Sequence, residues 1–146
     1  MWYLVGMVTD VLTPQLKTKQ LSPFYLSPIT AGFPSPADDY IEKSLDLNEY
    51  LVKHPSATFF VRVSGHSMVN AGIFHGDILV VDRSIQIYQN RIVVAVVNGE
   101  FTVKRFREVR NKVTLIAENP DYSPIEITHE TDFEVWGVVT NVIHKV

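Results

Sequence analysis

Beyond Pro55 the apolar positions of the chain fall in short runs that are rich in Val, Ile, Phe and Thr. Gly-Asp, Asn-Gly, Asn-Pro and Trp-Gly pairs separate these runs. β-branched and aromatic runs bounded by such pairs are typical of strands joined by turns. The pattern therefore predicts that nearly all of the chain after Pro55 is β-structure.

The residues before Pro55 follow two other patterns. Residues 13–37 contain five prolines among scattered Ser and Thr, a composition that disfavours both helix interiors and central strands. Residues 38–53 place apolar residues among charges and predict one or two short helices, the last capped by Asp46 and running to about Lys53. We therefore expect an extended N-terminal arm, residues 1–37, followed by a mainly β domain, residues 38–146.

The segment VVAVVNGEFTVKRF, residues 93–106, predicts a β-hairpin. Asn98-Gly99 between two β-rich runs favours a two-residue type I′ turn, in which both central residues take positive φ. A period of two then places Thr102, Lys104 and Phe106 on one face of the second strand. Phe101, Val103 and Arg105 lie on the other face, so the two cations point in opposite directions.

Composition narrows the class of protein. The chain has 146 residues, of which 46% are apolar, and this is enough for a single core. Its net charge of −3 provides no basic field, so direct specific DNA binding is not expected. The absence of cysteine excludes disulfides, thiolate metal sites and a cysteine nucleophile, and fits a cytoplasmic protein. The apolar N-terminus matches neither a signal peptide nor a membrane span, and no metal or cofactor motif is present.

Two readings are open for the cations of the hairpin. Each long side chain can extend out of the sheet to water, as lysine and arginine commonly do. Alternatively, a desolvated Lys104 can lose its proton and act as a base, whereas Arg105 cannot. The second reading requires a partner such as a hydroxyl held in an irregular turn.

The run SGHSM, residues 64–68, offers such a hydroxyl. Gly65 lets the chain turn at the end of the strand TFFVRVSG, which leaves Ser67 just past the strand with backbone amides near it. That position suits a nucleophile, although Ser64 and Ser67 can equally bond their own backbone, as serines in turns do. His66 is interpreted as a surface histidine, because adjacent side chains on an extended segment diverge.

The motifs SGHSM, HGDILVVD and EFTVKRF together resemble the LexA/UmuD family of self-cleaving serine-lysine peptidases. Further segments, among them AGFPSPADDY, YSPI and VWGVV, resemble the UmuD/MucA-like group in the same order. The resemblance covers roughly residues 29–140. It implies a twisted β-sheet fold like that of the LexA C-terminal domain.

The same resemblance implies a reaction and its residues. Ser67 would be the nucleophile, Lys104 the general base, and the bond between Ala31 and Gly32 the site of self-cleavage. A RecA filament on single-stranded DNA would stimulate this cleavage in the SOS response. The trimmed homodimer would then serve as the accessory subunit of an error-prone, UmuC-type translesion polymerase.

Other classes fit the sequence less well. The 31 residues before Gly32 lack a helix-turn-helix pattern, which disfavours a repressor, and no membrane anchor is evident, which disfavours a signal peptidase. A non-catalytic adaptor for RecA or the polymerase, with the same fold, is the main alternative. The apolar C-terminal run FEVWGVVTNVIHKV is either a core strand or part of a dimer interface.

Overall fold

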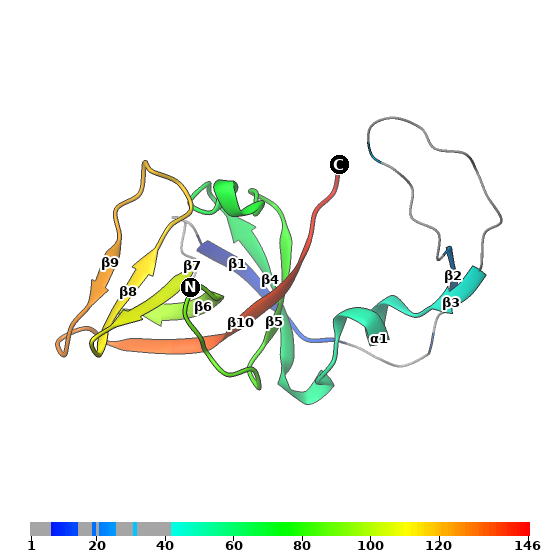
Figure 1. Cartoon of the computed structure of the whole chain (residues 1–146), viewed down its shortest axis with the longest axis horizontal. Coiled ribbons are helices and arrows are strands. Elements are labelled where there is room, and N and C mark those ends of the chain that lie inside the picture. The colour runs from blue at the N-terminus through cyan, green and yellow to red at the C-terminus, as the bar shows by residue number, and fades with distance from the viewer. Residues whose placement is uncertain (1–6, 15–18, 20, 26–30, 32–41) are drawn as a thin grey trace. The chain divides into compact units, whose positions relative to one another are not determined.

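The computed structural model of the chain describes residues 7–14, 19, 21–25, 31 and 42–146 (Figure 1). The chain divides into two compact units. The first contains the residues up to Pro14 together with His54–Val146, and the second is Gln15–Lys53. The first unit is built on an eight-stranded sheet with two short helical turns, so the prediction of a mainly β fold is confirmed.

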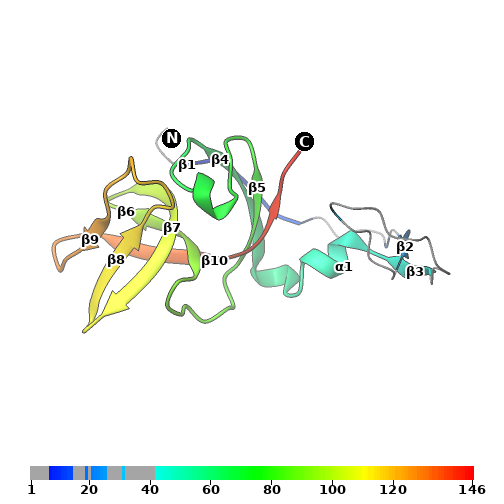
Figure 2. The same cartoon turned by 45° about the horizontal axis from the view of Figure 1, so that its top comes forward.

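The sheet of the first unit is antiparallel throughout and has the strand order β1-β4-β5-β10-β6-β7-β8-β9. The long strand β10 pairs with β6 through its first half and with β5 through its second, and so joins the two halves of the sheet (Figures 1 and 2). The strands are β1 (Met7–Leu12), β4 (Thr58–Ser64), β5 (Ile78–Asp82), β6 (Ile92–Val97), β7 (Glu100–Val109), β8 (Lys112–Ile116), β9 (Ile125–Ile127) and β10 (Phe133–Ile143). The two 3-10 turns are η1 (Pro55–Ala57) and η2 (Val69–Ala71).

Apolar residues are buried on both faces of the central strands. Strand β6 shows this directly, because Val94 belongs to one hydrophobic cluster and its neighbours Val93 and Ala95 to another. The first cluster also receives Met68, which follows the SGHS run, and the second receives Phe106 from β7. A polar side chain that is buried on these strands therefore lies in a dry environment and requires hydrogen-bonding partners.

The predicted hairpin is confirmed. Asn98 and Gly99 have φ values of 49° and 82°, and they join β6 to β7. Thr102, Lys104 and Phe106 are all buried on one face of β7, as the period of two requires. The turn thus fixes which cation of the Lys-Arg pair is directed into the protein.

The second unit contains the short hairpin of β2 (Ser22–Tyr25) and β3 (Glu42–Leu45), followed by α1 (Leu47–Leu51). The carboxylate of Asp46 accepts a hydrogen bond from Asn48 N at 3.0 Å and caps this helix. The predicted cap is therefore correct, and the helix ends two residues before Lys53.

The N-terminal residues differ from the expected arm. Met7–Leu12 form β1, which pairs with β4 at the edge of the main sheet. The run Met-Val-Thr-Asp-Val-Leu is rich in residues that favour strands, and β4 offers it an unpaired edge. The boundary between residues 37 and 38 falls outside the described residues, so the division into arm and domain stays a prediction.

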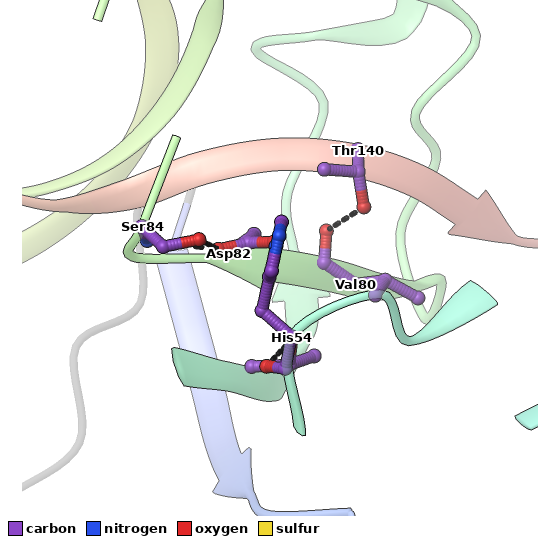
Figure 3. A network of polar contacts seen from close by, with 6 residues as sticks. His54, Val80, Asp82, Ser84 and Thr140 are labelled. Atoms are coloured by element: carbon purple, nitrogen blue, oxygen red, sulfur yellow. Dashed lines mark hydrogen bonds and ion pairs between the residues drawn. The ribbon is translucent and has the colours of Figure 1, made fainter. Parts of the chain in front are cut away.

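A polar network surrounds the buried carboxylate of Asp82 at the end of β5 (Figure 3). Ser84 donates to Asp82 Oδ1 from both its amide and its hydroxyl, and His54 Nδ1 lies 2.6 Å from Oδ2. Burial raises the pKa of Asp82, but these hydrogen bonds outweigh burial and hold the pKa below its usual value. The network also holds the chain at His54, where the second segment of the first unit begins. The carbonyl of His54 accepts a further hydrogen bond from the Thr58 hydroxyl at 2.7 Å.

Gly137 in β10 is a position where a larger side chain is expected to destabilise the fold. A Cβ atom there would lie 2.7 Å from Val81 Cγ1 and 3.0 Å from Asp82 O, and Val81 is fully buried. Gly137→Val should therefore lower the free energy of unfolding by about 1–3 kcal/mol through overpacking. Urea denaturation measures this change. Glu134→Val, at an exposed site of the same strand, is the matched control, and equal midpoints for the two variants would contradict the prediction.

Candidate active site

Ser67 lies where the sequence analysis places it, just past the end of β4. The chain turns at Gly65, whose φ of 92° is in a region that other residues rarely adopt. Met68 then inserts into the core, and this fixes the far end of the turn. The serine loop, residues 64–68, thus holds the Ser67 side chain inside the protein, where the residue is 3% exposed.

Lys104 points toward Ser67 from strand β7. Its Nζ atom lies 3.2 Å from Ser67 Oγ, 2.7 Å from Thr102 Oγ1 and 3.2 Å from Val103 O. The residue is only 5% exposed, so its side chain does not reach water as a surface lysine would. Of the two readings of the hairpin cations, the structure supports a buried lysine with a hydroxyl partner.

The surroundings of Lys104 favour its neutral form. Burial lowers the pKa of Lys104 to about 8, because the charged ammonium loses its hydration among the core residues. In the part of the chain that the structure describes, no carboxylate bonds Nζ, and its partners are two hydroxyls and a carbonyl. At pH 7 about one molecule in ten then carries a neutral amine at this position, against fewer than one in a thousand for a free lysine.

Arg105 behaves in the opposite way. It lies on the other face of β7, where its guanidinium pairs with Glu118 and donates to Asn90 O at 2.7 Å. Because arginine stays charged, it needs these partners and remains partly exposed. The adjacent cations therefore have distinct roles, with only Lys104 placed beside the serine.

A cleft of about 420 Å³ adjoins Lys104. It lies between the β6–β7 hairpin and the segment before β9, and it combines apolar, hydroxyl and amide groups. Its lining residues are Val97, Asn98, Glu100, Phe101, Thr102, Lys104, Tyr122, Ser123 and Ile125. Lys104 is among these lining residues, whereas Ser67 is not.

The remaining predicted site residues are described only in part. Ala31 is an exposed bend residue in the second unit, and Gly32 lies outside the described residues. The expectation that His66 is a surface residue is confirmed, since its side chain is exposed and its ring lies 6.1 Å from that of His75. Within the described part of the chain, no three His, Asp or Glu side chains are grouped to hold a metal ion.

Comparison with known proteins shows the family of the chain. The model of the peptidase S24-like family matches residues 23–140. The chain belongs to this family. It is 50% identical to protein MucA of Salmonella typhimurium over 120 residues, which are 82% of each chain. It is 41% identical to protein SamA of Salmonella typhimurium strain LT2 over 139 residues, which are 95% of this chain and 96% of SamA.

A further relative is longer than this chain. The LexA repressor of Photorhabdus laumondii is 41% identical over 118 residues, which are 80% of this chain and 58% of the repressor. The prediction of a UmuD/MucA-like member of the LexA/UmuD family is therefore confirmed. The relatives point to a UmuD-like SOS mutagenesis protein with self-cleaving serine peptidase character. Among the described residues, no helix is long and apolar enough to cross a membrane.

Sequence reasoning missed two contributors to the site. The period of two places Thr102 on the same face as Lys104, but it does not by itself predict the hydrogen bond between the threonine hydroxyl and the amine. A threonine two residues before the lysine is the signal that could have indicated this bond. Asn119 was not singled out, although its side chain donates to the carbonyl of His66 in the serine loop at 2.8 Å. Only the fold brings this residue, 53 positions away, to the loop.

Proposed function

We propose that the protein cleaves its own chain between Ala31 and Gly32, with Ser67 as nucleophile and Lys104 as general base. The observation that carries the proposal is the 3.2 Å approach of Ser67 Oγ to a buried lysine amine whose pKa is lowered to about 8. A hydroxyl beside a desolvated amine matches the serine-lysine variant of nucleophilic catalysis. The family assignment independently supports a peptidase.

The hydrogen bonds of Lys104 define its part in the reaction. A neutral amine has two N–H donors and one lone pair. Val103 O can only accept, and Thr102 Oγ1 lies at 2.7 Å, so these two atoms take the donors and direct the lone pair at Ser67 Oγ. The proton of the Ser67 hydroxyl then passes to Nζ as Oγ attacks the carbonyl carbon of Ala31.

The later steps follow from the same two groups. The protonated Lys104 returns the proton to the amine of Gly32 as the Ala31–Gly32 bond breaks, which leaves Ala31 esterified to Ser67. A water molecule, deprotonated by the neutral lysine, hydrolyses this ester and restores the hydroxyl. The reaction needs no cofactor or metal. Small residues at the cut allow the backbone to come close to Ser67.

The biological setting is proposed from the family. A RecA filament on single-stranded DNA stimulates the cleavage in the cytoplasm during the SOS response. The protein acts as a homodimer, and its trimmed form is the accessory subunit of a UmuC-type translesion polymerase. A non-catalytic adaptor would require neither the serine nor a buried lysine. Because burying an amine costs free energy of folding, the presence of the buried Ser67–Lys104 pair favours an enzyme over an adaptor.

Incubation with RecA, an ATP analogue and single-stranded DNA is expected to yield fragments 1–31 and 32–146. Because β1 pairs with β4, the small fragment can remain bound, and masses must be measured under denaturing conditions. Gly32→Val should block the cut by crowding the bond against the serine, while Ser35→Ala should leave it intact. A new amino terminus other than Gly32 would show that the proposed site is wrong.

A further inference from the structure

The connection between β8 and β9 contacts the serine loop and the turn that follows it (Figures 1 and 2). Asn119 Nδ2 donates to His66 O at 2.8 Å. The neighbouring Glu118 accepts from Asn70 N through its carbonyl at 2.9 Å, and its own amide donates to Met68 Sδ at 3.4 Å. Two consecutive residues therefore bond the chain on both sides of Ser67.

The same connection is also fixed to the strand of the lysine. The carboxylate of Glu118 forms an ion pair with Arg105, which directly follows Lys104 on β7. Arg105 is held in turn by Asn90 O. The Glu118-Asn119 pair thus links the serine loop to β7, the strand that carries Lys104, and it limits how far the loop can shift relative to this strand.

Asn119 is suited to this position because its side-chain amide accepts one hydrogen bond and donates another. Its Oδ1 atom accepts from Asp121 N at 3.0 Å, which sets the direction of the side chain within its own turn. The Nδ2 atom then points at His66 O, the carbonyl of the peptide unit that leads into Ser67. A side chain with only an acceptor would keep the first bond and lose the second.

We propose that Asn119 is a positioning residue for self-cleavage, because its side-chain donor fixes the peptide unit before Ser67 and so holds Oγ within reach of Lys104. The inference rests on the proposed dyad. A nucleophile displaced by about 1 Å reacts up to about 100-fold more slowly, even where the protein is otherwise unchanged. Loss of the donor should accordingly slow the chemical step without changing how readily Lys104 loses its proton.

The test compares Asn119→Asp and Asn119→Ala with the wild type and with Asn111→Asp. Asn111 lies in the exposed β7–β8 turn, so this control adds the same negative charge away from the site. Self-cleavage without RecA is followed from pH 6 to 10. The rate of Ser67 labelling by a fluorophosphonate is measured on the same samples, together with their thermal unfolding.

Both Asn119 variants should cleave about 10–100-fold more slowly than the wild type at every pH, with the inflection of the profile unmoved. Fluorophosphonate labelling should fall in parallel, and Asn111→Asp should match the wild type in both assays. Wild-type rates in Asn119→Asp, a shifted inflection, or slowing that only follows the unfolded fraction would overturn the inference. A wild-type chain that does not cleave at all would instead refute the proposed dyad.

Discussion

Ser67→Ala and Lys104→Arg are each expected to abolish self-cleavage, lowering its rate by at least about 10³-fold. The first change removes the attacking oxygen. The second replaces an amine that burial makes partly neutral with a guanidinium that stays charged at every accessible pH. Denaturing electrophoresis of samples kept with the RecA filament measures the loss as the absence of fragments.

The controls separate chemistry from folding. Ser56→Ala and Lys112→Arg make the same exchanges at exposed positions and should cleave like the wild type. Arginine is larger than lysine and can disturb the buried site, so Lys104→Met is included, which removes the amine with little change in volume. Cleavage at a normal rate in either Lys104 variant would remove the base role from this residue.

The sequence predicted those parts of the fold whose structure is set by nearby residues. The Asn98-Gly99 turn requires positive φ at two adjacent positions, and this residue pair adopts it readily. Asp46 likewise signals a helix start through a bond to Asn48 only two residues away. The turn at Arg110-Asn111 also has positive φ at both residues, but without a glycine it carries no comparable signal.

The candidate site likewise contains residues that short sequence motifs predict and features that only the folded chain reveals. Short motifs predict Ser67 and Lys104 as site residues, and the period of two in β7 places Lys104 and Arg105 on opposite faces without indicating which of them is buried. The Asn119 donor and the cleft beside Lys104 depend on loops that meet only after the sheet has formed. Strand β1 was missed because its partner β4 lies about fifty residues along the chain, and edge pairing leaves little local pattern.

The rate of RecA-independent self-cleavage is expected to rise about tenfold per pH unit up to about pH 8 and then to level off. Below its pKa of about 8, each unit of pH changes the neutral fraction of Lys104 tenfold, and only the neutral amine can take the proton from Ser67. Above that pH the amine is already neutral, so further alkali adds nothing. Alkaline buffer should therefore replace part of the stimulation by RecA.

The variant His66→Ala tests whether the histidine next to the serine, rather than Lys104, is the base. His66 has an exposed side chain, whereas Lys104 is buried with its Nζ atom beside Ser67 Oγ. His66→Ala should leave the profile nearly unchanged if Lys104 is the base. Loss of self-cleavage in His66→Ala would transfer the role to the histidine. Burial is what suits Lys104 to this role, because it lowers the pKa of the amine from its usual value of 10.5 to about 8.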